Sequence, residues 1–340
     1  MTEAHASAAR LLSPEEIAMR AGEQFSFLHL PEADVFAQRS LRLRELSAGH
    51  AMRDYLLFMS ELAQVQQSLL QDPAGLALPT QDQIESAAHA GKAVLDAAVW
   101  PRDPAWRDGF RQLMALLVQR IGQGAAREVA LKLAAAPDEW LEAQADRILN
   151  GIALDLDLAA APLIAAALQL YWTRLVNQVQ ARFDAASAQP PNALTPFGRT
   201  DDPTSCPCCG SRPVASITRV DAQGSGVRYL SCSLCASQWH YVRVKCSHCQ
   251  GTKGISFQSL VGQDGVTATP AVQAECCETC GHYLKIVHME KDLHVEPLAD
   301  DLATLTLDLL VSDTGLQRRG VNLMLWLGDS EAPPPDPGGH

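Results

Sequence analysis

The chain has 340 residues, of which 47 % are hydrophobic, so it is long enough for two or three folding units and is not mainly disordered. Its net charge of −12 and pI of about 5.2 exclude a general electrostatic attraction to nucleic acid or to an anionic membrane surface. The sequence has no apolar run of membrane-spanning length and no signal-peptide pattern at its start. We therefore expect a cytoplasmic protein without membrane insertion, whose partners are proteins or small molecules.

Residues 1–185 are expected to form an all-α helical bundle. Apolar side chains recur with the spacing of an amphipathic helix between Met52 and Leu70. A helix start is predicted at Asp103, which precedes a proline, and a helix end at Gly151. The alanine-rich stretch at 159–168 is apolar on nearly every face, which predicts a helix at the centre of the bundle.

The composition changes after the helical part. Residues 186–205 are polar and contain several prolines, which predicts a linker. The next 90 residues or so are rich in β-branched residues, glycines and cysteine pairs, which is typical of strands and tight turns. Residues 296–327 return to helical periodicity and predict a short C-terminal helix, whereas the proline and glycine content of 328–340 predicts a disordered tail.

All ten cysteines lie in one quarter of the chain, from Cys206 to Cys280, and the first 205 residues contain none. In a cytosolic protein, such crowding usually indicates metal ligation. Eight of the cysteines form Cys-x-x-Cys pairs, and each pair suits a tight turn, here called a knuckle, whose two thiolates bind one metal ion. The four knuckles are Cys206 with Cys209, Cys232 with Cys235, Cys246 with Cys249, and Cys277 with Cys280.

The spacing of the knuckles favours sequential pairing. The first two are separated by 22 residues and the last two by 27, enough for a β-hairpin, whereas only 10 residues separate the second from the third. We therefore expect two tandem rubredoxin-like or zinc-ribbon β modules, at 206–245 and 246–295, each with one four-thiolate site. Nested pairing, of the first knuckle with the fourth and the second with the third, is the alternative.

Four thiolates in a tetrahedron suit both zinc and iron, so the sulfurs alone do not identify the metal. Closed sites of this kind usually stabilise a small β unit, and only iron would add redox chemistry. Two cysteines, Cys208 and Cys276, are not needed as ligands and are expected to be the reactive thiols of the native protein. Among the histidines, His248 inside the third knuckle is expected to lie nearest a metal, with its ring donating to a thiolate.

Four strings, "RYLSCSLC", "WHYVRVKCSHC", "CETCGHYLKI" and "ADDLATLTLDLL", resemble those of the FdhE family of formate dehydrogenase accessory proteins. The resemblance implies a multi-domain α+β protein with a helical N-terminal half, four knuckles and a short C-terminal helix. It also implies a non-catalytic cytoplasmic assembly factor that binds the catalytic subunit of a respiratory formate dehydrogenase before export. By the same resemblance, iron is the favoured metal, with the first two and the last two knuckles as its ligand sets.

Two other functions fit the sequence less well. A zinc-ribbon nucleic-acid binder is disfavoured because residues 201–296 contain eight Lys or Arg against nine Asp or Glu, without a basic stripe. A thiol-disulfide redox protein fits poorly, because such a dithiol normally begins a helix in a βαβ unit. The sequence contains no P-loop, dinucleotide-binding fingerprint, His-Glu-x-x-His motif or nucleophile elbow, so we do not expect an enzyme.

Overall fold

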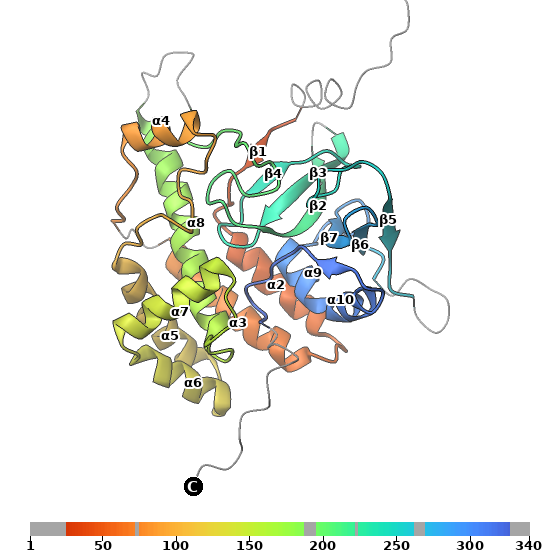
Figure 1. Cartoon of the computed structure of the whole chain (residues 1–340). Helices are drawn as coiled ribbons and strands as arrows, with labels where there is room; N and C mark the ends of the chain where they lie inside the picture. The colour runs from red at the N-terminus through yellow and green to blue at the C-terminus, as the bar shows by residue number, and fades with distance from the viewer. Residues whose placement is uncertain (1–24, 72–74, 187–194, 222–223, 262–268, 327–340) are drawn as a thin grey trace, which may run out of the picture.

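A computed structural model shows a helical bundle on one side and a β-sheet on the other (Figure 1). The residues that it describes are 25–71, 75–186, 195–221, 224–261 and 269–326. The expected α+β architecture, with a helical N-terminal half, a cysteine-bearing β region and helices near the C-terminus, is confirmed. The linker expected at 186–205 lies partly outside the described residues, and the tail expected at 328–340 lies wholly outside them.

The N-terminal half contains seven of the described helices. They are α2 (Val35–Ser47), α3 (Arg53–Leu70), α4 (Gln81–His89), α5 (Ala105–Arg120), α6 (Ala125–Ala134), α7 (Asp138–Asn150) and α8 (Ala161–Ala185). The helix predicted from the apolar spacing at 52–70 is α3. Helix α7 ends as expected, because Gly151 adopts the left-handed conformation (φ 68°) that glycine tolerates best. Near the start of α5, the Asp103 carboxylate accepts a hydrogen bond from the backbone amide of Ala105 (2.9 Å).

Helix α8 forms the centre of the bundle, as its composition predicts. Every residue from Ala161 to Val176 is buried, because the alanines let neighbouring elements approach on all sides. The approach is close enough for polar contacts to the backbone. Gln66 of α3 donates to the carbonyl oxygen of Ala166 (2.8 Å), and the Trp172 indole donates to that of Leu95 (3.0 Å). The long helix therefore ties α3 to the loop that precedes α5.

The described strands form one eight-stranded sheet. They are β1 (Leu28–His29), β2 (Pro213–Asp221), β3 (Gly224–Cys232), β4 (Gln238–His240), β5 (Ile255–Gln258), β6 (Val272–Cys277), β7 (His282–His288) and β8 (Gln317–Arg318). The order across the sheet is β1-β4-β3-β2-β7-β6-β5, and β8 pairs with β7. Strands β2, β3 and β4 are antiparallel neighbours, as are β5, β6 and β7.

Two features of this sheet were not expected from the sequence. The two cysteine modules share the sheet, because the first strand of one module, β2, pairs in parallel with the last strand of the other, β7. In addition, β1 belongs to the N-terminal half but pairs with β4, so Leu28 lies opposite Trp239. One hydrophobic core consequently extends from the bundle into the first module.

The C-terminal helical segment consists of two short helices, α9 (Pro297–Ala303) and α10 (Leu305–Ser312), where one helix was expected. The interruption lies at Thr304, whose hydroxyl donates to the carbonyl oxygen of Asp300 (2.7 Å). At the same place the buried ammonium of Lys285 donates to the carbonyl oxygen of Asp301 (2.6 Å). A lysine of β7 thus forms a hydrogen bond to a backbone carbonyl oxygen at the point where the helix is interrupted.

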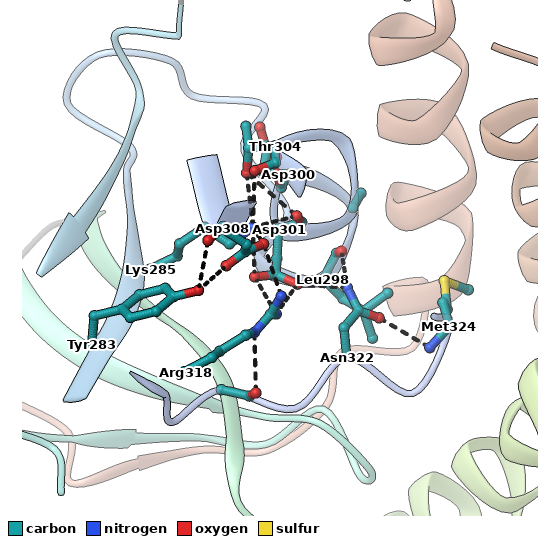
Figure 2. Close-up of polar contacts among 12 residues, drawn as sticks. Tyr283, Lys285, Leu298, Asp300, Asp301, Thr304, Asp308, Arg318, Asn322 and Met324 are labelled. Carbon is teal, nitrogen blue, oxygen red and sulfur yellow. Dashed lines mark hydrogen bonds and ion pairs between the residues drawn. The ribbon is translucent and has the colours of Figure 1, made fainter. Parts of the chain in front are cut away.

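Figure 2 shows the polar network that joins these helices to the second module. Lys285 of β7 forms ion pairs with Asp308 (2.6 Å) and Asp301 (3.1 Å), and Arg318 of β8 binds both oxygens of Asp301 (2.7 and 2.6 Å). The Tyr283 hydroxyl donates to Asp308 (3.0 Å). Burial opposes the ionisation of Asp301, but Arg318 and Lys285 outweigh it and hold the pKa of Asp301 below its ordinary value.

A second set of ion pairs joins the bundle to the C-terminal segment. On α2, Arg39 contacts Glu296 (3.1 Å) and Arg42 contacts Asp300 (2.7 Å), and all four side chains are largely buried. Arg42 also contacts Asp292 (2.8 Å). These pairs fix α2 against α9, at the base of the sheet in Figure 1. None of the described helices is both long and apolar enough to cross a membrane.

Candidate metal centres

All four knuckles have the same backbone turn. The residue after the second cysteine has a positive φ in each: Gly210 (71°), Ala236 (59°), Gln250 (61°) and Gly281 (70°). In the first three knuckles the amide of the first cysteine donates to the carbonyl oxygen five residues later, at 2.8–2.9 Å. In the fourth, Cys277 is paired with His282 between β6 and β7. A left-handed residue reverses the chain immediately after each pair, so both thiols face the same side.

The sulfurs gather into two groups of four. The first contains Cys206, Cys209, Cys232 and Cys235, and the second contains Cys246, Cys249, Cys277 and Cys280. Within each group the sulfur atoms all lie within 4.8 Å of one another. The first knuckle therefore lies against the second and the third against the fourth, which is the sequential arrangement.

The distances between sulfurs fit a metal ion and do not fit a disulfide. Across the first group, Cys206 and Cys235 are 3.6 Å apart and Cys209 and Cys232 are 3.4 Å apart. The corresponding distances in the second group are 3.7 and 3.8 Å. A disulfide bond measures about 2.05 Å. A tetrahedron with metal–sulfur bonds of about 2.3 Å has edges of about 3.8 Å, close to the observed spacing.

Backbone amides also point at the sulfurs. Leu234 and Cys235 donate to the Cys232 sulfur (3.3 and 3.4 Å), and the amide of His248 donates to the Cys246 sulfur (3.3 Å). Such bonds stabilise thiolates rather than thiols and are the usual surroundings of a metal-bound cysteine. It is the backbone of His248, not the ring that the sequence suggested, that makes this contact.

The first group is enclosed between the sheet and the bundle. Its four cysteines are all buried. The loop before α5 covers the first knuckle, because Leu95 and Ala97 donate to the carbonyl oxygens of Cys208 (3.1 Å) and Cys209 (2.9 Å). From α8, Gln169 donates to the carbonyl oxygen of Ser233 in the second knuckle (2.8 Å). The bundle is thus bonded directly to the backbone that carries these thiols.

The second group is more open. Cys246 and Cys277 are buried, but Cys280 is partly exposed and Cys249 is exposed. The rings of His248 and His282 stack beside this group, with centroids 3.8 Å apart and planes inclined by 24°. The two groups therefore have the same four-cysteine composition and the same turns but different access to solvent.

Burial opposes the ionisation of the enclosed thiols. Burial raises the pKa of the Cys206 and Cys232 thiols well above the ordinary value, because a thiolate loses its hydration there. Burial also opposes the ionisation of Cys235, but hydrogen bonds from the neighbouring thiols bring its pKa well below the usual value. A metal ion supplies the positive charge that four thiolates in one buried group require.

The two additional cysteines are inaccessible, contrary to the expectation that they are the reactive thiols. Cys208 is 0 % exposed and Cys276 is 1 % exposed. Burial raises the pKa of Cys208, and burial together with Glu275 raises that of Cys276 to about 11. A buried thiol with a raised pKa is a weak nucleophile, so these positions do not favour a thiol-disulfide redox protein.

This architecture defines a class: an α-helical bundle joined to a β-sheet that carries two four-cysteine groups on paired knuckles. Comparisons with known proteins identify it further. Sequence models described as "FdhE, N-terminal", "FdhE, central domain" and "FdhE, C-terminal domain" match residues 25–189, 205–243 and 244–325. The chain belongs to the FdhE family.

Relatives support the assignment along nearly the whole chain. A protein named "Protein FdhE homolog" from Pseudomonas aeruginosa is 38 % identical over 301 residues, covering 88 % of this chain and 92 % of the relative. The homolog from Yersinia enterocolitica is 36 % identical over 298 residues, covering 87 % and 89 %. The crystal structure of the FdhE protein from Pseudomonas aeruginosa matches with a TM-score of 0.71 at 34 % identity, over 89 % of this chain and 99 % of that one.

Proposed function

We propose that this protein is a non-catalytic accessory factor for the assembly of a respiratory formate dehydrogenase, and that it binds the catalytic subunit in the cytoplasm before export. The observation that carries the proposal is the combination of family membership across all three parts of the chain with two complete four-cysteine groups. The formate dehydrogenase role follows from the resemblance of the cysteine and C-terminal strings to that family.

The eight cysteines of the four knuckles are proposed as the ligands of two metal ions. Each ion would be held by two knuckles, and would contribute on the order of 10 kcal/mol to the folding of its small β unit. Iron is the metal that the family resemblance favours, and four thiolates bind zinc as well. The thiols, the turns and the backbone amides described above all suit either ion.

A groove between the bundle and the sheet is the proposed binding surface for the catalytic subunit. It has a volume of about 560 Å³ and lies between β1, α2 and the segment at 289–297. Leu41 and Leu293 line it, and both are more than 60 % exposed. Exposed leucines beside a concave surface are typical of a protein-binding site, and the volume suits a few side chains of an extended segment.

Affinity purification from the native host tests the proposal. The tagged protein should recover the catalytic subunit of formate dehydrogenase from the cytoplasmic fraction, in its form before export. A variant with Leu41→Asp and Leu293→Asp should lose the subunit while keeping its metal content. The matched control is Leu131→Asp on α6, where an exposed leucine (51 %) lies outside the groove. Failure of the unmodified protein to recover the subunit would refute the proposed role.

A further inference from the structure

The second four-cysteine group differs from the first in having two imidazoles at its open side. His248 lies between the two cysteines of the third knuckle, and His282 follows the fourth knuckle at the start of β7. His248 is exposed and His282 is half-buried, next to the exposed Cys249 and the partly exposed Cys280. In contrast, the first group is covered by the loop before α5 and by α8.

The hydrogen bond of His282 to the backbone uses one ring nitrogen and leaves the lone pair of the other available. Its Nδ1 lies 2.8 Å from the carbonyl oxygen of Cys280. A carbonyl oxygen can only accept a hydrogen bond, so Nδ1 carries the proton in a neutral ring and Nε2 carries the lone pair. An imidazole that donates through one nitrogen to a backbone carbonyl, with the other nitrogen free, has the arrangement usual for metal-binding histidines.

The stacked rings place a second imidazole 3.8 Å from the first, and both rings line a small hollow together with Cys246 and Cys277. Imidazole binds divalent ions such as Zn²⁺, Co²⁺ and Fe²⁺. An ion that arrives from solvent would therefore meet exposed imidazole before it reaches the buried sulfurs of Cys246 and Cys277. Elsewhere in the described residues, the histidine ring contacts of His29 and His240 are made with Tyr229 and not with a second histidine.

We propose that His248 and His282 form a loading site for a divalent transition-metal ion at the open side of the second four-cysteine group. The ion binds an imidazole nitrogen first and then passes to the four sulfurs. Each thiol releases its proton to solvent as its sulfur–metal bond forms, the nitrogen–metal bond breaks, and no electrons are transferred. The same path in reverse releases the ion. The proposal rests on the two proposed four-thiolate sites and adds that only the second one exchanges readily.

The test begins with the full chain loaded with two zinc ions in reducing, oxygen-free buffer. An excess of a chromogenic chelator should remove one equivalent quickly and the other slowly. The fast equivalent should be missing from a Cys249→Ser variant, which places it in the second group. After removal of the fast ion, Co²⁺ is added and the thiolate-to-cobalt absorption bands are followed by stopped flow.

The His248→Ala/His282→Ala double variant should fill the second group about tenfold more slowly than the unmodified chain, in line with the effect of imidazole partners on metal sites. The slow zinc phase should not change. The exposed His89→Ala on α4 is the matched control and should leave both rates unchanged. Removal of rings that merely shield the site would accelerate filling, so an equal or faster rate in the double variant overturns the loading site.

The outcomes also separate this proposal from the one on which it rests. Release of both zinc ions in one phase would be consistent with two metal sites. It would refute the proposal that only the second site exchanges its ion readily. A chain that binds no metal ion at all would overturn the two four-thiolate sites themselves, and the loading site with them. A His248→Asn/His282→Gln variant, which keeps polar side chains of similar size, should show the same slow filling and excludes misfolding as the cause.

Discussion

Gly320 has no room for a side chain. A Cβ atom at this position would lie 2.5 Å from the carbonyl oxygen of Val214, and the next residue, Val321, donates to the carbonyl oxygen of Pro213 (3.0 Å). The Gly320→Ala variant should therefore force the C-terminal segment away from β2 and lower the free energy of unfolding by about 1–3 kcal/mol. Urea denaturation measures this value. Gly122→Ala, where an added Cβ meets no atom within 4 Å, should cost less than half as much.

Cys208 and Cys276 should be unreactive in the folded protein. Both are buried and both have a raised pKa, so an alkylating reagent reaches them only after unfolding. Mass spectrometry after brief alkylation of the metal-loaded chain should find both residues unmodified. After mild chelation, the exposed Cys249 should be the first cysteine to react. Modification of Cys208 or Cys276 in the metal-loaded, folded chain would contradict the structure.

The candidate ligands could be predicted from the sequence because two cysteines three positions apart form a local unit. Their reactivity and surroundings could not, since burial depends on residues far away in the chain. Cys208 is enclosed because Leu95, more than 100 positions earlier, bonds to its carbonyl group. Likewise, two of the four left-handed positions are occupied by Ala236 and Gln250 and not by glycine. The turn that all four knuckles share could therefore not be predicted from the sequence.

Lys285 should be essential for the attachment of α9 and α10. It is 2 % exposed and pairs with two buried aspartates, Asp301 and Asp308. The Lys285→Met variant removes one of the positive charges that offset the buried carboxylates of Asp301 and Asp308. It should therefore lower the free energy of unfolding by about 3–5 kcal/mol. Chemical denaturation tests this, with the exposed Lys291→Met as the matched control. An effect of Lys285→Met below about 1 kcal/mol would contradict the network in Figure 2.

Glu142 on α7 should make the bundle sensitive to acid. It accepts from Arg102 (2.6 Å), Trp106 (2.8 Å) and Arg107 (2.6 Å), which join α7 to the start of α5. Burial opposes its ionisation, but these partners hold the pKa of Glu142 below its ordinary value of 4.5. A carboxylate with a lowered pKa in the folded state contributes stability above the unfolded value, and this contribution is lost as the pH falls through the folded value.

The Glu142→Gln variant tests this pH dependence. At neutral pH it should be less stable than the unmodified chain by about 1–3 kcal/mol, because hydrogen bonds to a charged group are lost. The difference should shrink as the pH falls below about 4.5, because the protonated glutamic acid then resembles glutamine. Comparing the two chains at each pH cancels effects of acid on the metal sites. The control is Glu139→Gln at an exposed position of the same helix. A stability difference between Glu142→Gln and the unmodified chain that does not change with pH would contradict the lowered pKa of Glu142.

Helices were predicted more completely than strand partners. The periodicity at 52–70 and the composition at 159–168 are local, so α3 and the centre of α8 followed from them. The parallel pairing of β2 with β7 joins residues about 70 positions apart, and no local pattern specifies it. The break at Thr304 was not predicted either, and the carbonyl oxygen of Asp301 beside it accepts from a lysine of another element.

The whole molecule combines an enclosed and an open cysteine group on one sheet. The first group is bonded to the bundle and the second lies near the far side of the sheet, where β5 is the last strand (Figure 1). Sequence spacing predicted two modules of the same design, and both are present in the sheet. Their different exposure could not be predicted, because it results from how the bundle packs.

Metal analysis of the protein purified from its host without oxygen decides whether eight cysteines hold two metal ions. Elemental analysis should give two ions per chain, with thiolate-to-metal absorption bands in the visible range if they are iron and a colourless protein if they are zinc. Replacing Cys206 and Cys246 by Ser together should abolish both. A folded, reduced chain that carries no metal ion, or only one, would contradict the assignment of the eight cysteines to two metal sites.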